Sequence, residues 1–307
     1  MARDVDTRVS EDLNHVFRSL VVAVLLLLPV AAAPLPAPAQ GTPWIPRGDE
    51  LWILQTYKTD LATSEGLVAD SNWGKELQPQ FVVVPLYSGD TSVPPLSAKQ
   101  VASYHNQGIR VVCTIAFGYW DRSTPDSEQF SPSMIGRSVW GDADRRWLDI
   151  RNTGVRSLMD ARMGHAAEIG CDAIDATYME LWYQTTGFFI TYGDQLAYNR
   201  FLADSAHAHG LSIGLHNTTQ QIADLVGWYD FAIAENCLEA AECGIYTPFK
   251  ELDKPVFQLE YDAISSEIHI CNAGRDFGYN TIIKTRNPNL FYPNRFEIDT
   301  FARACGV

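Results

Sequence analysis

The chain has 307 residues, of which 46% are hydrophobic and 20% charged, an ordinary globular composition. This excludes a collagen-like, low-complexity or disordered chain, and the length exceeds that of a miniprotein held together only by disulfides. With 23 Lys and Arg against 37 Asp and Glu, the net charge is -14. Nucleic acid is not an expected partner, because its binding needs clustered cations, whereas a cationic or neutral partner suits this charge.

The N-terminal segment contains a continuous apolar run from Leu20 to Ala33. As a helix rising about 1.5 Å per residue, this run reaches about 21 Å, short of the roughly 30 Å hydrocarbon core of a bilayer. We interpret residues 1–39 as a signal peptide that ends at the small residues Ala37-Pro38-Ala39, or as a signal anchor if it is not cleaved. The protein is therefore expected to be secreted, and to contact a membrane only if this segment is retained.

All six cysteines follow the apolar run, and an even number in an exported chain predicts disulfides. Fifteen pairings are possible in principle. Cys237 and Cys243 are close enough for a small loop, and a bond between Cys271 and Cys305 would fix the C-terminus. A zinc site is the alternative, but the cysteines lack a C-x-x-C motif or a closely spaced pair of histidines, so we expect no metal.

After residues 40–50, interpreted as a linker, short apolar segments alternate with amphipathic stretches, which is the pattern of βα units. The capping-box sequence Ser97-Ala98-Lys99-Gln100 opens the first expected helix, and several helices end at glycine. Strands are predicted at 51–55, 81–85, 110–116, 173–175, 211–216, 231–235, 256–260 and 281–284. Helices are predicted at 97–107, 155–169, 194–209 and 220–226.

Continuous apolar strands such as 81–84 are typical of a parallel sheet that helices cover on both faces. Eight βα units over roughly 260 residues fit a (β/α)8 TIM barrel, so we predict this α/β fold as a single domain over residues 51–307. The alternative is an open doubly wound sheet, but no G-x-G-x-x-G follows the first strand. Residues 117–149, the longest stretch without a predicted element, are expected to form a loop over the top of the barrel.

Active sites of such barrels are built at the carboxyl ends of the strands. Asp175, Glu235 and Glu260 are carboxylates at predicted strand ends, and burying an unpaired carboxylate is costly, so we interpret them as part of a site. Interior ion pairs with Lys284 or Arg286 are the alternative interpretation. The other predicted substrate-binding residues end strands, follow them or lie in loops: Gln55, Tyr87, Trp120, Asp149, Tyr178, His216, Asn217 and Lys284.

Two carboxyl groups that face one another across an aromatic-lined cleft are suited to glycosidic bond hydrolysis, in which one is a protonated acid and the other a nucleophile or base. Flat aromatic faces can pack on sugar rings, and several aromatic residues lie in or near the expected loops: Trp120, Trp140, Tyr178, Trp182 and Tyr183. Serine hydrolase, P-loop and zinc-protease motifs are missing from the sequence.

Six strings carry a resemblance to a known family: Arg146-Trp147-Leu148-Asp149-Ile150-Arg151, Gly170-Cys171-Asp172, Asp194-Gln195-Leu196-Ala197-Tyr198-Asn199, Gly210-Leu211-Ser212-Ile213-Gly214-Leu215, Asp230-Phe231-Ala232 with Glu235 and Cys237, and Glu260-Tyr261. In this order they resemble glycoside hydrolase family 114, the endo-α-1,4-polygalactosaminidase group, from Trp52 to Cys305. The resemblance implies a (β/α)8 barrel that cleaves an α-1,4-linked galactosamine-containing polysaccharide by a retaining mechanism, with no cofactor. A deacetylated galactosamine polymer is cationic and would be attracted by an acidic cleft.

The resemblance also assigns residues. The family's acid on strand six falls on Glu235, the expected acid/base. On strand four the family reads Glu-Pro-Asp-Asn-Val-Asp, whereas this chain reads Asp175-Ala176-Thr177-Tyr178-Met179-Glu180, so the central Asp, the expected nucleophile, becomes Thr177. The family's Asp near the end of strand two aligns with Pro85, and its Lys-Asn-Asp after strand five is replaced by His216-Asn217-Thr218.

Thr177 cannot act as a carboxylate nucleophile, so Asp175 or Glu180 would have to replace it. We expect Asp175, on the rigid strand, about 5 to 5.5 Å from Glu235 if the mechanism is retaining. The alternatives are a carbohydrate-binding homologue with impaired catalysis and a glycosidase with another sugar specificity. The formal glycosylation sequon Asn217-Thr218-Thr219 is expected to stay unoccupied at the mouth of the barrel, and the protein is expected to be a monomer.

Overall fold

The computed structural model describes residues 42–54, 69–70, 76–77, 79–89, 94–262, 265–286 and 298–305. Eight parallel strands, each paired with the next, form a sheet that nearly closes into a barrel. The predicted (β/α)8 fold is therefore confirmed. The strands are β1 (Trp52–Leu54), β4 (Phe81–Pro85), β5 (Arg110–Ala116), β9 (Ala173–Thr177), β10 (Ser212–His216), β11 (Phe231–Glu235), β12 (Val256–Tyr261) and β13 (Asn280–Arg286).

Side chains join the first and last parallel strands. The Trp52 indole donates to the Asn280 carbonyl at 3.3 Å, and the Lys284 ammonium donates to the carbonyl of Leu54. Beyond β13, β14 (Ile298–Ala304) pairs antiparallel, and β2 (Ala69–Asp70) and β3 (Glu76–Leu77) extend the same sheet. Lys284 therefore lies inside the seam of the barrel as a buried cation.

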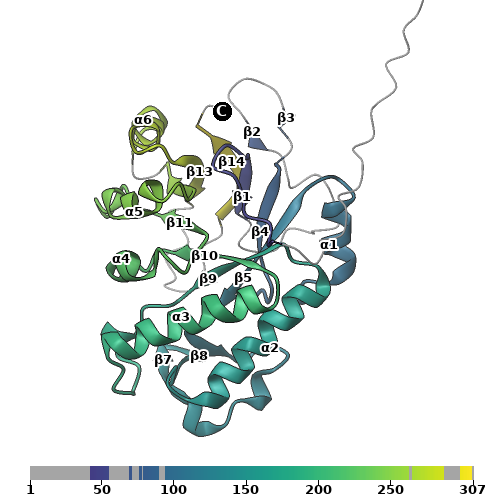
Figure 1. Ribbon diagram of the computed structural model, residues 1–307, viewed down its shortest axis with the longest axis vertical. Coiled ribbons are helices and arrows are strands. Elements are labelled where there is room, and N and C mark those ends of the chain that lie inside the picture. The colour runs from purple at the N-terminus through teal and green to yellow at the C-terminus, as the bar shows by residue number, and fades with distance from the viewer. Residues whose placement is uncertain are drawn as a thin grey trace, which may run out of the picture. The chain divides into compact units, whose positions relative to one another are not determined.

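Helices lie around the outside of the strands (Figure 1). Ser97 and Gln100 form the predicted capping box at the start of the first helix, and Gly170 ends the second in the left-handed conformation, with φ of 97°. The predicted helix 220–226 is a 3-10 turn (Thr219–Gln221) followed by one short helix. The helices are α1 (Ala98–His105), α2 (Thr153–Ile169), α3 (Tyr192–Ala208), α4 (Ile222–Leu225), α5 (Thr247–Glu251) and α6 (Glu267–Phe277).

Within the described ranges, no helix has both the length and the apolar character needed to cross a membrane. The predicted leader, residues 1–39, lies outside the described residues, as does Gln55.

Aromatic rings fill one layer of the barrel interior. The fully buried Phe257 ring lies 5.5 Å from Trp52, 5.0 Å from Phe81 and 6.0 Å from Phe231, edge-on in each case. Gly214 on β10 makes room for this layer, because a Cβ there would lie 2.2 Å from the Phe231 ring. Close packing of these rings leaves the polar interior residues nearer the carboxyl ends of the strands.

The prediction that residues 117–149 form a loop is wrong. They form a three-stranded antiparallel sheet of β6 (Tyr119–Asp121), β7 (Ile135–Val139) and β8 (Asp142–Leu148), in the order β6-β8-β7, with 3-10 turns at Ser127–Gln129 and Pro132–Met134. The strands are short, and β8 begins with charged, largely exposed residues, so no apolar run marks them. Helices α5 and α6 were also not predicted.

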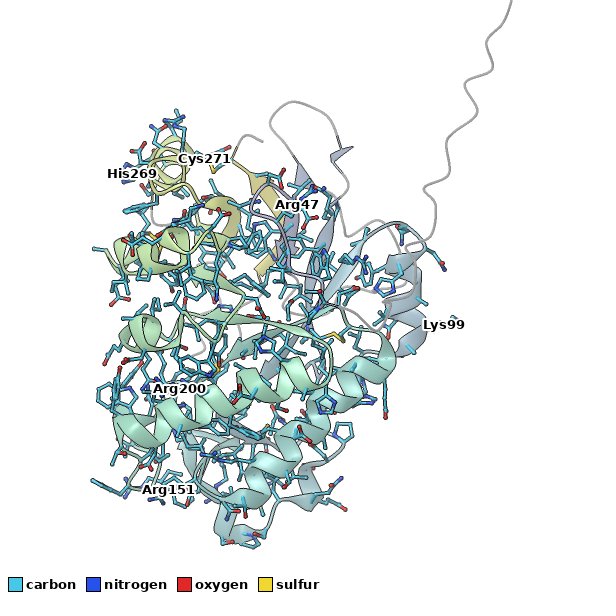
Figure 2. The ribbon with its side chains drawn as sticks, viewed as in Figure 1. Arg47, Lys99, Arg151, Arg200, His269 and Cys271 are labelled. Carbon is cyan, nitrogen blue, oxygen red and sulfur yellow. A yellow bond between two sulfur atoms is a disulfide. The ribbon has the colours of Figure 1, made fainter. Side chains whose placement is uncertain are left out.

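Three disulfides tie the chain together. The two pairings expected from sequence, Cys237 with Cys243 and Cys271 with Cys305, are both confirmed, and Cys271 is labelled on α6 in Figure 2. The remaining bond joins Cys113 on β5 to Cys171, which follows α2.

The disulfides are predicted to differ in their contribution to stability. Loop-closure entropy grows with the length of chain enclosed, so replacing the Cys113–Cys171 pair with alanine, a separation of 58 residues, is expected to lower the free energy of unfolding by about 4 kcal/mol. The matched control, the Cys237–Cys243 pair with a separation of 6, should lower it by about 2 kcal/mol. Urea unfolding of the oxidised proteins measures both, and equal losses would contradict the entropic argument.

Candidate active site

Three ionisable side chains meet inside the barrel near the carboxyl ends of adjacent strands. His216 ends β10, between Asp175 on β9 and Glu235 at the end of β11. Its Nδ1 lies 2.9 Å from Asp175 Oδ1, and its Nε2 lies 3.1 Å from Glu235 Oε2. Because β10 pairs with both β9 and β11, strand register itself places the imidazole between the two carboxylates.

The two carboxylates of this triad differ in exposure. The Asp175 side chain is 0% exposed and accepts a hydrogen bond from the Thr114 hydroxyl at 2.8 Å. The Glu235 side chain is 29% exposed and accepts a hydrogen bond from the Tyr261 hydroxyl at 2.6 Å. Only Glu235 is therefore open enough to meet a ligand directly.

The triad controls its own protonation. Burial alone would lower the pKa of His216, but the neighbouring carboxylates of Asp175 and Glu235 outweigh it and raise that pKa to about 10. Burial would likewise raise the pKa of Glu235, but the His216 cation, the Tyr261 hydroxyl and the charge of Lys284 hold that pKa below its usual value. At neutral pH His216 is protonated and Glu235 is ionised.

Glu180 has the opposite character. It follows β9, and burial raises the pKa of this carboxyl group above its usual value. A hydrogen bond donated by the Tyr183 hydroxyl, at 2.9 Å, works against this rise, and repulsion from Glu242 adds to it. Glu180 therefore keeps its proton to higher pH than an ordinary glutamic acid.

Three cavities share these residues. The first, about 250 Å³, lies at the mouth of the barrel and is lined by residues that include Thr177, His216 and Glu235. The second and third, about 280 and 290 Å³, are both lined by Glu180, Asn217 and Glu235. Glu235 thus borders all three cavities, and Glu180 shares two of them with it.

Several predicted site residues do line these cavities. Tyr87 and Tyr178 border the first, and Tyr178 also borders the second. Asn217, at a positive φ of 52°, accepts hydrogen bonds from the backbone N–H of Glu235 at 2.9 Å and from the Tyr246 hydroxyl at 3.2 Å. Lys284 is buried and acts on Glu235 through its charge.

The structure does not bring Trp120 or Asp149 to the cavities. The Trp120 indole donates to the Ser127 carbonyl at 2.9 Å, and its neighbours Tyr119 and Asp121 line the first cavity instead, because side chains alternate along β6. Asp149 forms an ion pair at 2.8 Å with Arg151, which is labelled at the lower left of the molecule in Figure 2.

Glu260 is also displaced from the expected site. It lies on the opposite face of β12 from Tyr261 and accepts hydrogen bonds from the Leu238 N–H at 2.8 Å and the Gln258 side chain at 2.9 Å. It therefore supports the loop after β11. Among the described residues it also belongs to one group that could hold a metal, with Cys237 and Cys243, but those sulfurs are joined in a disulfide and are not thiolates.

Two cationic residues of the site, Arg145 and Arg162, were not predicted from the sequence. Arg145 on β8 lines the first cavity and pairs with Asp121 at 3.0 Å. Arg162 on α2 is 4% exposed, pairs with Asp126 at 2.7 Å and lies 5.5 Å from the centre of the Tyr87 ring. A charged residue among the apolar positions of α2 was the available signal for Arg162.

The central ion pair predicts a pH-dependent stability. With a folded-state pKa of about 10 against about 6.5 when unfolded, protonated His216 stabilises the fold fully below pH about 6.5, and this contribution is lost as pH rises through about 10. His216→Gln leaves Asp175 buried without its cation and should lower the free energy of unfolding by about 3–5 kcal/mol near pH 6. The difference from wild type should shrink as the pH approaches 10.

Chemical unfolding over pH 6 to 10 measures this difference. His207→Gln is the matched control, because His207 forms a similar 2.9 Å ion pair with Asp230 but its side chain is 37% exposed. We expect that control to lose less than about 1 kcal/mol. A pH-independent difference for His216→Gln would contradict the assignment of a cation at this position.

Comparisons with known proteins agree with this architecture. The sequence model of glycoside-hydrolase family GH114 matches residues 34–305. Ega3 of Aspergillus fumigatus, solved in complex with galactosamine, is 23% identical with a TM-score of 0.68 over 86% of this chain and 98% of that chain. The glycoside hydrolase domain of PelA from Pseudomonas aeruginosa is 13% identical, with a TM-score of 0.51 over 79% of this chain and 96% of that chain.

These two structures are similar to the chain in fold. No protein in the search of curated sequences matches significantly. The family match covers most of the chain, including every parallel strand of the barrel. The chain belongs to glycoside-hydrolase family GH114.

Proposed function

We propose that the protein hydrolyses an α-1,4-linked, galactosamine-containing polysaccharide, with Glu180 as the proton donor and Glu235 as the ionised carboxylate. One observation carries this proposal: the two carboxyl groups line the same two cavities, and their pKa values are shifted in opposite directions. Glycosidases use such a pair, one carboxyl protonated and the other charged.

These roles differ from those expected from the sequence. Glu235 was expected to be the acid/base, but its lowered pKa suits a nucleophile. Asp175 was expected to be the nucleophile, but it is fully buried and held by His216 and Thr114. We assign Asp175 the role of positioning His216, which in turn holds Glu235.

The reaction follows from these protonation states. Glu180 donates its proton to the glycosidic oxygen while the bond from that oxygen to the anomeric carbon breaks. Glu235 forms a bond to the anomeric carbon, in the retaining route that the family resemblance implies. Water then attacks the same carbon, Glu180 takes its proton, and the bond to Glu235 breaks.

The substrate class rests on charge. Glu235 and Glu242 line the third cavity beside the protonated Glu180, and the whole chain carries a net charge of -14. A deacetylated galactosamine polymer is cationic, so this acidic region would attract it. The galactosamine bound to Ega3 supports the same sugar here.

The cellular location is a further part of this proposal. We propose that residues 1–39 direct export or anchor the chain, that residues 40–50 link them to a catalytic domain at 51–307, and that this domain acts outside the cell. The three disulfides support an oxidising compartment.

The catalytic pair is tested by Glu235→Gln and Glu180→Gln. Each is expected to reduce the release of new reducing ends from partly deacetylated galactosaminogalactan by at least about 100-fold, because each removes a proton donor or a carboxylate that acts in the transition state. Asp149→Asn, outside the cavities, is the control and should retain activity. Full activity in Glu180→Gln, together with total loss in a folded Asp175→Asn, would show that Asp175 and not Glu180 is the second catalytic carboxyl group.

The pH profile is expected to shift in opposite directions in two variants. Activity should fall at low pH as Glu235 is protonated and at high pH as Glu180 ionises. Tyr183→Phe removes a hydrogen bond that favours the Glu180 carboxylate, so its pKa and the alkaline limb should move up. Glu242→Gln removes repulsion, so both should move down.

Profiles of kcat/KM against pH, measured on one substrate for wild type and both variants, decide this point. Wild type and Asp149→Asn should share the same alkaline limb. Shifts of the same sign in Tyr183→Phe and Glu242→Gln would rule out Glu180 as the acid.

A carbohydrate-binding homologue without turnover is the second candidate. Thr177 favours it, because it lines two of the cavities where the family sequence carries an Asp. If this candidate is right, wild type binds the polymer but releases no more reducing ends than Glu235→Gln. Thr177→Asp should then create activity, whereas in an active enzyme built on Glu180 it should not raise the rate.

A further inference from the structure

Trp140 is an unusual residue for the backbone conformation of the turn between β7 and β8. Val139 pairs with Asp142, so the loop consists of Trp140 and Gly141, with φ values of 49° and 88°. Two successive positive φ values define the tight hairpin turn that favours Asn-Gly or Asp-Gly. A bulky side chain is disfavoured in this left-handed region, so the backbone itself gives no reason for a tryptophan.

The Trp140 indole is held but not buried. It packs edge-on against the buried Trp147, with ring centroids 6.0 Å apart, and lies 5.9 Å from Tyr178 at an interplanar angle of 47°. Trp140 remains 55% exposed. Tyr178 is itself at a positive φ of 58°, and its ring packs edge-on against Tyr119 at 4.6 Å. Two adjacent aromatic rings are thus presented from left-handed backbone positions.

These rings border the cavity of the proposed catalytic pair. Trp140, Trp147 and Tyr178 line the second cavity together with Glu180 and Glu235. We infer that Trp140 and Tyr178 form a stacking platform for one galactosamine ring of the bound polysaccharide. The inference rests on the proposed function for the identity of the sugar, and it assigns the ring contact that this function leaves open.

The chemistry of the sugar suits such a platform. In a galactose-configured ring O4 is axial, so the hydrogens on C3, C4 and C5 form one apolar face. That face packs on the electron-rich face of an indole or phenol ring. The amino and hydroxyl groups remain at the edge of the ring, where the carboxyl groups of Glu180 and Glu235 accept hydrogen bonds. A glucosamine ring has an equatorial O4, so its C4 hydrogen points to the opposite face from those on C3 and C5. The face made by C3, C4 and C5 is therefore less apolar, and the ring should bind the platform less well at equal charge.

Binding to the full chain carrying Glu235→Gln tests the inference without hydrolysis. Calorimetry with an α-1,4-linked galactosamine tetramer should show binding weakened at least about tenfold by Trp140→Ala and by Trp140→Asn, but little changed by Trp140→Phe. A chitosan tetramer, equally cationic but of β-1,4-linked glucosamine, differs in both the C4 configuration and the linkage, and should bind less tightly and respond less to Trp140. The matched control is Trp228→Ala, which removes a 36% exposed tryptophan that packs on Arg200 and lines none of the three cavities.

Trp140→Asn separates binding from folding, because asparagine suits the left-handed turn. Its thermal midpoint should be at least as high as that of Trp140→Ala, while its binding is equally weak. Parental affinity in Trp140→Asn, or loss of the cooperative unfolding transition in that variant, would overturn the platform.

The outcome also differs from failure of the proposed function. If the wild type releases no reducing ends but tetramer binding depends on Trp140, the platform stands and the hydrolase does not. If the wild type hydrolyses the polymer but Trp140→Ala binds and hydrolyses as the wild type does, the hydrolase stands and the platform does not. If no tetramer binds to the parent, the platform is overturned, and the release of reducing ends by the wild type decides the hydrolase separately.

Discussion

A single imidazolium between two carboxylates determines the site. Asp175 has no exposed surface, and an unpaired carboxylate there would be strongly unfavourable, so His216 has to carry a positive charge. Glu235 is the open member of the three, with 29% of its side chain exposed, so its negative charge is presented to the cavities. The barrel interior therefore supplies an ionised carboxylate at a fixed position.

The rest of the site is added to this centre by segments outside the parallel strands. The loop after β9 contributes Glu180 and Tyr178, and the disulfide-closed segment after β11 contributes Glu242. The small sheet after β5 contributes Trp140. Such a division is usual for barrels, in which strands fix geometry and loops set chemistry. It gives one cavity both carboxyl groups and aromatic faces.

The sequence predicted the barrel because its signals are local. The apolar run of β4 and the capping box at Ser97 need no knowledge of the rest of the chain. The site depended on which face of a strand turns inward, and a shift of one residue reverses that face. Glu260 and Trp120 were expected in the site, but their neighbours Tyr261 and Tyr119 take those positions. The small sheet escaped prediction because β8 opens with charged residues that face solvent.

The choice between Asp175 and Glu180 shows the same limit and explains the altered family motif. Sequence reasoning preferred Asp175 for its rigid strand, but the strand buries it. Thr177, in place of the family's Asp, is neutral and donates to the Ile115 carbonyl of β5 at 3.2 Å. Three residues later, this chain has Glu180 where the motif of the family resemblance has Asp, and the extra methylene extends the carboxyl group further from the backbone. Under the proposed function, loss of one carboxylate at the strand end and lengthening of the next are therefore matched changes that place the second acid in the loop after β9.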